Sequence, residues 1–500
     1  MGFRGAFLVI CFGLFIFPSS LLAAKNVILL VGDGMALEHI GFFITVRKGM
    51  KAEPTSLEKV LATAPTGFVK TGSLGFAITD SAAAATAIAC GRKTLPDVLG
   101  MDGKGRALES TLEKAEKEGF WTGVISTHRI SDATPAAFYA SLPTRDWHDR
   151  VVEQLLDSGI EVALGGGLRY FIPKGDKVSS RFPFMTVWSD YADKSGRRDE
   201  RNLLGEFAAA GYHLVHDRDT LAEVDALETK KLLGLFSPHD MSFELDRRSE
   251  DHWQPTLAEM TDKALDIMDR SPKGFFLLVE GASIDTTAHH NDAAAMLGEM
   301  KAFDDALSRC LDYAREKRDT LVIVTADHGT GGPGFAYHVK WKDKMSRKLS
   351  EDYTWKEGYD YVPYAPVAEI LSKQRASFSR IALKSKLKAE KLLQVVKKYS
   401  SYDFSLEDAR KVLRKAPSKW GPKVDDEWFD FYPNKYYYRY GSLAKILGRQ
   451  TGVVWGTGTH TGTPVPIMAV GPSSSAVRGL HDNTWLHHYM NHALGLEEPR

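Results

Sequence analysis

Carboxylate and imidazole side chains recur at short spacings in this sequence, close to apolar runs. Asp285 and His289 are four residues apart, so one helical turn would place them on the same face. Asp327 and His328 form an adjacent pair after another apolar run. Asp, Glu and His ligands together suit zinc, whereas carboxylate and hydroxyl oxygens suit magnesium. Any one pair alone would more often be structural, but together they predict a metal centre. Its candidate ligands are Asp33, Glu280, Asp285, His289, Asp327, His328 and His460.

A serine at the head of an alanine-rich segment is the candidate nucleophile. Ser81 follows Asp80 and precedes four alanines, which favour a helix that Asp80 or Ser81 can cap. A hydroxyl at that position faces free backbone N–H groups and the positive end of the helix dipole, which together suit a phosphoryl group. Taken alone, an ordinary capped helix is the more economical interpretation. The metal candidates make the functional one stronger.

Buried strands that alternate with helices must position these side chains. Continuous apolar runs are typical of strands buried on both faces, and strand–helix alternation predicts an α/β fold with a mainly parallel central sheet and helices on both faces. Several candidate ligands directly follow such runs, and ligand sites in these sheets lie beyond the carboxyl ends of the strands. The runs are 26–31, 122–126, 275–279, 321–325 and 466–470, and the helical patterns include 107–118, 255–270 and 292–317.

The rhythm of strands and helices breaks down between about 333 and 450. Tyr, Trp and Lys become dense there, 377–400 is basic with a helical pattern, and 428–440 is crowded with aromatic residues. The next strand of the main pattern comes only after His460. We therefore expect a large insertion before the last candidate ligand, which could be a crown-like substrate lid, an oligomer contact or a folded decoration.

Residues 1–24 have the layout of a secretory signal peptide. Arg4 precedes an apolar run from 6 to 17 that is short for a membrane span, and Ala23-Ala24 offers an imperfect cleavage site. We expect a periplasmic or secreted protein with no stable membrane anchor, although an uncleaved anchor is the alternative. Cleavage would leave Cys90 and Cys310, which we expect to be buried thiols. A disulfide between them is left open.

The balance of charge excludes a general electrostatic attraction to nucleic acid. The chain of 500 residues carries 64 Lys and Arg against 64 Asp and Glu, a formal net charge of zero. At 43% hydrophobic residues it can bury the core of a globular enzyme. We expect small molecules as its partners.

In chain order, the motifs resemble those of the alkaline phosphatase family, over almost all of residues 25–500 apart from the 333–450 segment. Each motif is short, and the order of the set carries the resemblance. It implies one catalytic domain over 25–500 that hydrolyses phosphate monoesters through a phosphoserine intermediate. The motifs are Asp-Gly-Met at 33–35, Thr-Asp-Ser-Ala-Ala at 79–83, Asp-Ala-Thr-Pro-Ala at 132–136, Arg145, Gly-Gly-Gly at 165–167, 280–289, Thr-Ala-Asp-His-Gly at 325–329 and His-Thr-Gly at 460–462.

The resemblance also implies a role for each matching residue. Ser81 would be the nucleophile, and the planar fork of Arg145 would hold two phosphate oxygens. By ordinary statistics Arg145 would instead pair with Asp146 or Asp149 on the surface. Two zinc ions and one magnesium ion would be bound. Asp285, His289 and His460 would hold one zinc; Asp33, Asp327 and His328 would hold the other; Asp33, Thr134 and Glu280 would hold magnesium, with Asp132 orienting its waters.

One departure from the family pattern concerns Thr286. The family often has Lys, His or Trp directly after the residue that corresponds to Asp285, and threonine supplies no positive charge there. Phosphate affinity, product release and metal preference are the properties affected. Many relatives are dimers, so a homodimer is also implied.

Other functions fit the same motifs less well. A phosphodiesterase is the main alternative, although Arg145 favours a monoester, because a second ester group would crowd the oxygens it binds. A sulfatase would need its modification signature around the nucleophile, whereas alanines follow Ser81. A binding protein without catalysis should lack a ligand or the nucleophile. Gly165–Gly167 could cradle phosphate but better fits a tight turn. Seven other histidines are interpreted as structural or solvent-facing: His128, His239, His290, His481, His487, His488 and His492.

Overall fold

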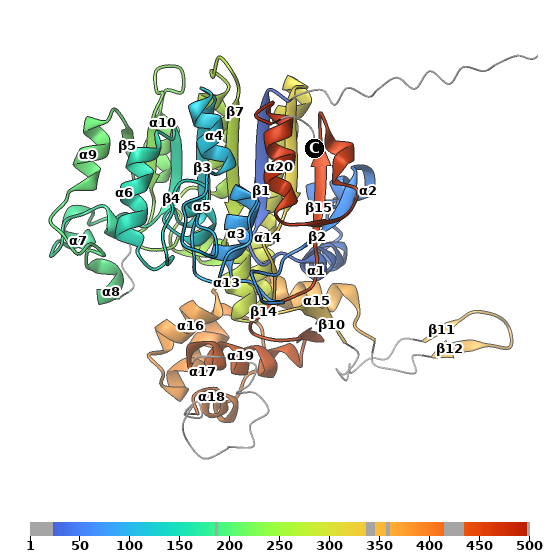
Figure 1. Cartoon of the computed structure of the whole chain (residues 1–500). Helices are drawn as coiled ribbons and strands as arrows, with labels where there is room; N and C mark the ends of the chain where they lie inside the picture. The colour runs from blue at the N-terminus through green and yellow to red at the C-terminus, as the bar shows by residue number, and fades with distance from the viewer. Residues whose placement is uncertain (1–23, 186–188, 337–345, 357–360, 415–434, 498–500) are drawn as a thin grey trace, which may run out of the picture.

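A ten-stranded sheet runs through the centre of the molecule, with helices on both of its faces (Figure 1). The computed structural model describes residues 24–185, 189–336, 346–356, 361–414 and 435–497, so the signal-peptide prediction lies almost entirely outside the described residues. In their order across the sheet the strands are β16 (Gly479–Asp482), β2 (Thr66–Lys70), β15 (Val465–Val470), β8 (Thr320–Thr325), β1 (Asn26–Gly32), β7 (Phe275–Gly281), β3 (Trp121–Arg129), β4 (Val162–Gly166), β6 (Leu232–Leu235) and β5 (His213–Val215).

The sheet is mainly parallel, as the sequence predicts. Only β15 runs against its neighbours β8 and β2, and each other neighbouring pair is parallel. Every residue of β1, β7 and β8 is buried, because helices cover both sides of these central strands. Their continuous apolar sequences follow from that burial.

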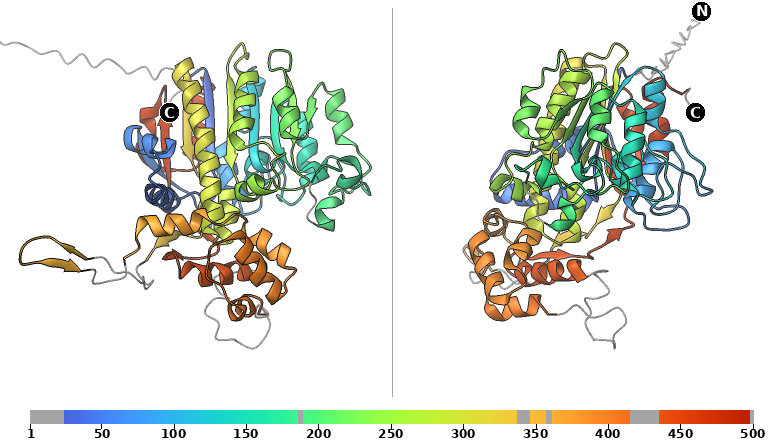
Figure 2. Two further views of the ribbon diagram at one scale, coloured as in Figure 1. Left: turned by 180° about the vertical axis from the view of Figure 1, so that it is seen from behind. Right: turned by 90° about the vertical axis from the view of Figure 1, so that its left-hand side faces the viewer.

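Helices α3, α4 and α20 pack on one face of the sheet, and α12 and α14 pack on the other (Figures 1 and 2). The predicted helices at 107–118, 255–270 and 292–317 are confirmed, and each is shorter than predicted. The helices of the main body are α1 (Leu37–Gly49), α2 (Ser56–Thr63), α3 (Ser81–Cys90), α4 (Thr111–Lys117), α5 (Ala133–Ala136), α6 (His148–Ser158), α7 (Val178–Arg181), α8 (Asp190–Asp193), α9 (Leu203–Ala209), α10 (Arg218–Glu223), α11 (Glu244–Ser249), α12 (Leu257–Met268), α13 (Ser283–His289), α14 (Ala293–Lys317) and α20 (Trp485–Ala493).

The 333–450 segment forms a separate layer beyond the carboxyl ends of the strands, beside α13 (Figure 1). It has a hydrophobic cluster of its own, in which Phe378, Val396 and Leu447 are buried. Its base is closed by a short antiparallel pair. The elements are β10 (Pro333–Phe335), which pairs with β13 (Val453–Trp455), the hairpin β11 (Ser346–Lys348) and β12 (Thr354–Lys356), and the helices α15 (Tyr364–Ser372), α16 (Phe378–Ser385), α17 (Ala389–Tyr399), α18 (Leu406–Val412) and α19 (Lys435–Gly448).

The helical pattern at 377–400 is two helices rather than one. Lys386 and Leu387 both have positive φ, 49° and 55°, so the chain turns between α16 and α17. The turn lets both helices bury their apolar faces in the same cluster. Part of the aromatic segment at 428–440 lies outside the described residues.

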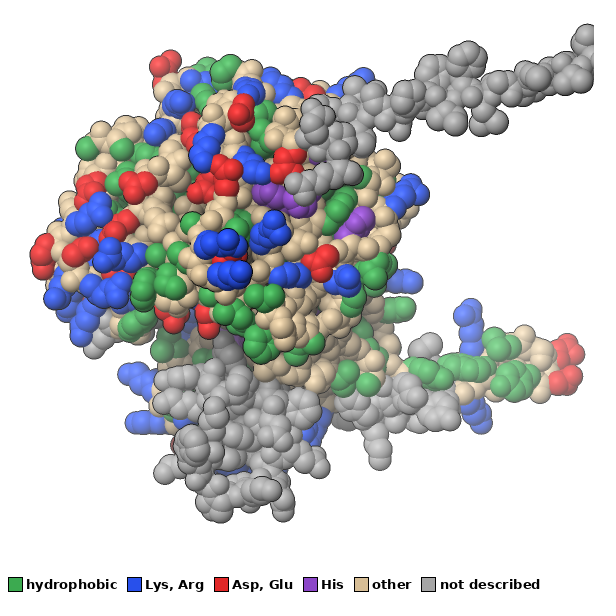
Figure 3. All heavy atoms as spheres, viewed as in Figure 1, with side chains coloured by type: hydrophobic (Ala, Val, Ile, Leu, Met, Phe, Trp, Pro, Cys, Tyr) green, Lys and Arg blue, Asp and Glu red, His purple; other side chains and the backbone are tan. Residues whose placement is uncertain are grey.

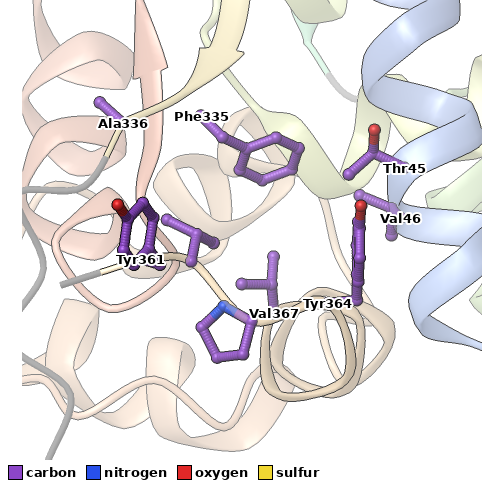
Figure 4. A pocket seen from close by; sticks show the side chains of 9 residues that line it. Thr45, Val46, Phe335, Ala336, Tyr361, Tyr364 and Val367 are labelled. Atoms are coloured by element: carbon purple, nitrogen blue, oxygen red, sulfur yellow. The ribbon is translucent and has the colours of Figure 1, made fainter. Parts of the chain in front are cut away.

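The inserted layer meets the main body at an apolar pocket of about 270 Å³ between α1, β10 and α15 (Figure 4). Phe335 lines it and stacks on Phe42 of α1, with 4.7 Å between ring centroids. Tyr361 and Tyr364 also line it, at opposite edges in Figure 4, and are half exposed. Aromatic packing therefore contributes to the junction.

Cys90 and Cys310 are both buried, free thiols, so the disulfide that the sequence left open does not form. Basic and acidic side chains are interspersed on the face shown in Figure 3, in keeping with the net charge of zero. Among the described residues, no helix combines the length and the apolar character needed to cross a bilayer.

Candidate active site

The candidate ligands meet at the carboxyl end of the sheet because the central strands end in register. Val31 of β1 pairs with Glu280 of β7 on one side and with Thr325 of β8 on the other. Asp33 and Asp327 therefore leave neighbouring strands at the same level, next to Glu280. The last ligand, His460, returns after the inserted layer through the short strand β14 (His460–Thr461), which pairs with β9 (Gly329–Thr330).

Ser81 is the first residue of α3, where the sequence places it. The carboxylate of Asp80 caps the helix by accepting hydrogen bonds from the N–H groups of Ala82 and Ala83, at 3.3 and 3.1 Å. Asp80 therefore is the cap, and the Ser81 hydroxyl is left for chemistry. Its Oγ lies 3.3 Å from Nε2 of His328. The helix ends at Cys90 with Gly91 in the left-handed region.

The first predicted zinc group is assembled around His328. Its Nε2 lies 3.5 Å from Oδ1 of Asp33 and 3.2 Å from Oδ2 of Asp327. Among the described residues, these two carboxylate oxygens are buried with no hydrogen-bond partner. Burial and the neighbouring carboxylate of Asp327 raise the pKa of Asp33, and burial raises the pKa of Asp327 to about 7. Burial lowers the pKa of His328, and two buried carboxylate oxygens without hydrogen-bond partners beside its imidazole are a donor set that fits a cation.

The second predicted zinc group combines α13 with the returning strand β14. Asp285 and His289 face each other across one turn of α13, with 3.3 Å between Oδ2 and Nε2. His460 Nε2 lies 3.0 Å from His289 Nε2 and 3.7 Å from Asp285 Oδ1. Although burial opposes it, His289 and His460 hold the pKa of Asp285 below its usual range. The three ligand atoms converge within 4.8 Å, which fits one ion.

The predicted magnesium ligands lie close by but are less tightly clustered. Glu280 is buried and accepts a hydrogen bond from Ser126 Oγ at 2.5 Å, and burial raises the pKa of its carboxyl to about 7. Glu280 and Asp132 both lie near enough to Asp33 to raise its pKa, after burial and the closer carboxylates. Thr134 is buried as the second residue of α5, two positions after the cap Asp132. An acidic, oxygen-rich set of this kind suits magnesium.

The carboxylate of Asp132 is already fully engaged by the protein. Its Oδ1 accepts from Arg145 at 2.8 Å and from Arg129 at 3.1 Å, and its Oδ2 contacts His128 Nδ1 at 2.9 Å. Although burial opposes it, Arg129 and Arg145 hold the pKa of Asp132 well below its usual range. An orienting role therefore fits Asp132 better than direct ligation.

Arg145 points into the site rather than along the surface. Beside the 2.8 Å bond to Asp132, its Nη1 lies 3.6 Å from Asp80 Oδ2, next to the nucleophile. The surface alternative is wrong for Asp149, which accepts two hydrogen bonds from Arg198 instead. A guanidinium between the caps of α3 and α5 can hold an anion in front of Ser81.

Sequence reasoning missed the part that His128 plays. The interpretation of His128 as structural or solvent-facing does not include its contacts, because the ring is buried between Asp132 and Thr286. Although burial opposes it, Asp240 and Asp132 raise the pKa of His128 to about 9. Its spacing of four from Asp132 was the available signal. Arg129 and Asp240, which also join this cluster, carried no signal of their own.

The other histidines differ in their surroundings. His290 is buried against the rings of Phe243 and Tyr440. His239 contacts Asp240, and His487 is buried on α20 with its Nδ1 2.6 Å from the carbonyl oxygen of Ala89. Gly165 and Gly166 belong to β4, so the turn interpretation of this motif holds only for Gly167, which has a φ of 99°.

Known proteins share this arrangement of motifs and fold. A model of the alkaline phosphatase family matches residues 24–399 and 436–496, which includes most of the 333–450 segment. The chain belongs to the alkaline phosphatase family. Members of this family are metal-dependent enzymes that act on small phosphate esters, and the chain is accordingly a hydrolase.

Individual relatives extend this finding over most of the chain. Alkaline phosphatase 4 of Bacillus subtilis is 29% identical over 479 residues, which cover 92% of this chain and 86% of the relative. The alkaline phosphatase of Escherichia coli is 33% identical over 379 residues, which cover 64% and 75%. The crystal structure of Thermus thermophilus alkaline phosphatase matches with a TM-score of 0.80 at 29% identity, over 95% of this chain and 92% of that one.

Proposed function

We propose that this alkaline phosphatase hydrolyses phosphate monoesters to alcohol and inorganic phosphate through a phosphoserine at Ser81. The observation that supports this most directly is the position of Ser81 Oγ, 3.3 Å from His328 in the buried acidic group and at the N-terminus of α3. A phosphoryl group there would lie at the positive end of the α3 dipole. Arg145 would hold it from the side of Asp132.

We assign two zinc ions and one magnesium ion to the site. Asp285, His289 and His460 would hold one zinc, and Asp33, Asp327 and His328 would hold the other. Glu280, Thr134 and Asp33 would hold magnesium, with Asp132 beside them. When bound, such ions stabilise alkoxide and leaving-group charge and lower the pKa of water. The buried carboxylate oxygens of Asp33 and Asp327 that have no hydrogen-bond partner support the assignment of a cation between them.

The side chains of the protein divide the work of the reaction. Ser81 Oγ would attack phosphorus in line, and the bond to the departing alcohol would break on the opposite side. Asp80 holds the first turn of α3, and so the nucleophile, in place. Arg145 would bind two non-bridging oxygens in the ground state and in the transition state. Water then would release phosphate from Ser81 and restore its hydroxyl.

One assay tests this proposal. Metal-loaded enzyme should release phosphate from an aryl monoester and much less from the matching diester, because the second ester group crowds the oxygens at Arg145. Ser81→Ala should abolish turnover and the acid-stable phosphate label on the protein. Activity that survives both Ser81→Ala and chelation would refute the mechanism, and a strong preference for the diester would establish the alternative.

We further propose a domain plan and a location. Residues 1–24 would be a cleaved signal peptide, and 25–500 a catalytic domain with a crown-like layer at about 333–450. The enzyme then would work in the periplasm or outside the cell as a homodimer, without a stable membrane anchor. N-terminal sequencing of the exported protein and its mass in solution test these points.

A further inference from the structure

The carboxyl end of β3 departs from regular strand geometry at the site. Ile125 pairs with Leu164 of β4, but Arg129 pairs with Gly166, so residues 126–128 have no regular partners in that ladder. Irregularities of this kind turn side chains in a new direction and are frequent beside active sites. Here they bring the side chain of His128 toward α5 and α13.

Two hydrogen bonds tie this irregular segment to a predicted metal ligand. The N–H of His128 donates to Ser126 Oγ at 3.0 Å, and Ser126 Oγ donates to Glu280 Oε2 at 2.5 Å. From the other side, the N–H of Ser283 donates to Thr127 Oγ1 at 3.2 Å. The position of His128 is thereby fixed relative to both Glu280 and the start of α13.

Each nitrogen of the His128 ring has a different partner. Nδ1 lies 2.9 Å from Asp132 Oδ2, and Nε2 lies 3.3 Å from Thr286 Oγ1. Only 8% of the residue is exposed. With Oδ2 of Asp132 occupied in this way, Oδ1 alone remains for the Arg145 guanidinium. Together with the N–H of Ala133, which donates to Oδ1 at 2.9 Å, the ring sets which oxygen of Asp132 faces Arg145.

A further metal site at this point is not favoured. His128, Asp132 and Asp240 have ligand atoms within 4.8 Å of one another. However, Arg129 donates to Asp240 at 2.7 Å and to Asp132 at 3.1 Å, so one guanidinium already bridges the two carboxylates. A cation would have to displace this guanidinium.

We propose that His128 is a positioning residue of the phosphate site, which holds Asp132 through Nδ1 and thereby aims Arg145 at the phosphoryl group. Its Nε2 contacts the Thr286 hydroxyl on the side of the ring away from Asp132. Thr286 has a short side chain, so the ring of His128 makes the contact with Asp132. This inference rests on the proposed function, because it takes Arg145 as the phosphate-binding residue. Without His128, Asp132 can rotate and engage Arg145 or Arg129 with both oxygens, which would draw the guanidinium away from phosphate.

The test compares variants that separate the two ring nitrogens. Asparagine places an N–H donor near the position of Nδ1, so His128→Asn should keep the bond to Asp132, whereas His128→Gln and His128→Ala should lose it. In the metal-loaded enzyme we expect His128→Ala to raise KM and the inhibition constant of inorganic phosphate about tenfold, with a smaller change in kcat. His128→Asn should recover most of that loss.

A second readout is independent of turnover. Calorimetric titration of inorganic phosphate into Ser81→Ala should show the same order of affinities when the His128 substitutions are added. His487→Asn, at a buried histidine outside the site, is the matched control and should lower thermal stability without changing phosphate affinity. Equal affinities for His128→Ala and the unsubstituted chain, or equal losses in the Asn and Ala variants, would overturn the inference.

Arg145→Ala, measured in parallel, separates the two hypotheses. If it leaves phosphate affinity unchanged, the proposed phosphate site itself is wrong. If it weakens phosphate binding while His128→Ala does not, only the role of His128 is wrong. If His128→Ala does not fold, the comparison of His128→Asn with His128→Gln gives the decision.

Discussion

The Nε2 atoms of His289 and His460 lie 3.0 Å apart and face each other across the site. Nδ1 of each ring meets a backbone carbonyl oxygen at 2.8 Å, that of Gly458 for His289 and that of Thr79 for His460. A carbonyl accepts a hydrogen bond, so in their neutral forms both rings would carry the proton on Nδ1 and present a lone pair at Nε2. Two lone pairs at this distance, next to the Asp285 carboxylate, repel one another unless a cation lies between them.

Removal of metal should therefore destabilise the protein as well as inactivate it. We expect a chelator to abolish phosphate release and to lower Tm, and zinc to restore both. Zinc at a hundredfold excess over its Kd would contribute about 2.7 kcal/mol to the free energy of unfolding. His460→Ala should remove most of the Tm rise on adding zinc. A Tm that does not respond to chelation and zinc would contradict this interpretation.

Arg145 should matter through its planar fork as well as through its charge. Arg145→Ala should lower kcat/KM for an aryl monoester. The decrease should correspond to a loss of about 2–4 kcal/mol of transition-state stabilisation. Arg145→Lys should recover little, because an ammonium group cannot engage two oxygens and Asp132 together. Steady-state kinetics measure both. Arg198→Ala, at an exposed partner of Asp149, is the control and should leave kcat/KM nearly unchanged.

Glu299 should make stability depend on alkaline pH. Its side chain is buried on α14, where Oε1 accepts a hydrogen bond from the N–H of Glu244 at 2.5 Å, and burial raises its pKa to about 8 from an ordinary value of 4.5. The folded protein thus holds this proton where the unfolded chain has released it. Its contribution to the free energy of unfolding is full below pH 4.5 and is lost as pH rises toward about 8.

Glu299→Gln should consequently stabilise the protein by about 1–3 kcal/mol at pH 9 and by little at pH 5, because glutamine stays neutral and can still accept the same bond. Denaturant unfolding at the two pH values measures this. Glu316→Gln, at an exposed residue of the same helix, is the control. A gain that is equal at both pH values would contradict the prediction.

The inserted layer should be held to the main body by Arg380. This buried arginine of α16 contacts Glu250 at 2.8 Å, Asp251 at 2.7 Å and Asp246 at 3.7 Å. Arg380→Ala leaves buried carboxylates without their partner and should lower the free energy of unfolding by about 3–5 kcal/mol. Lys384→Ala, which removes a more exposed partner of Glu250, should cost less than about 1 kcal/mol.

The predicted loss can be localised by hydrogen exchange. Arg380→Ala should raise exchange first in α16 and α17, while β1 and β7 stay protected. A uniform increase across the whole chain would show that Arg380 supports the global fold rather than this junction.

The central strands and most of the candidate site could be predicted from the sequence. Buried central strands must be apolar throughout, so the continuous apolar runs locate 26–31, 275–279 and 321–325. The polar residues that follow these strands had to lie at one edge of a parallel sheet. Asp285 and His289 share one helical turn, so their convergence is a local property of the chain.

The contacts between these residues and distant parts of the chain follow from the tertiary fold and could not be predicted from the sequence. His460 reaches His289 because β14 pairs with β9 after the inserted layer, and that pairing joins segments more than a hundred residues apart. The direction of Arg145 depends on Asp132 and Asp80, and the direction of Asp132 depends on an irregularity in β3 that turns His128 inward. The spacing of four between His128 and Asp132 is visible in the sequence, but the contact of His128 with the Thr286 hydroxyl exists only in the folded chain.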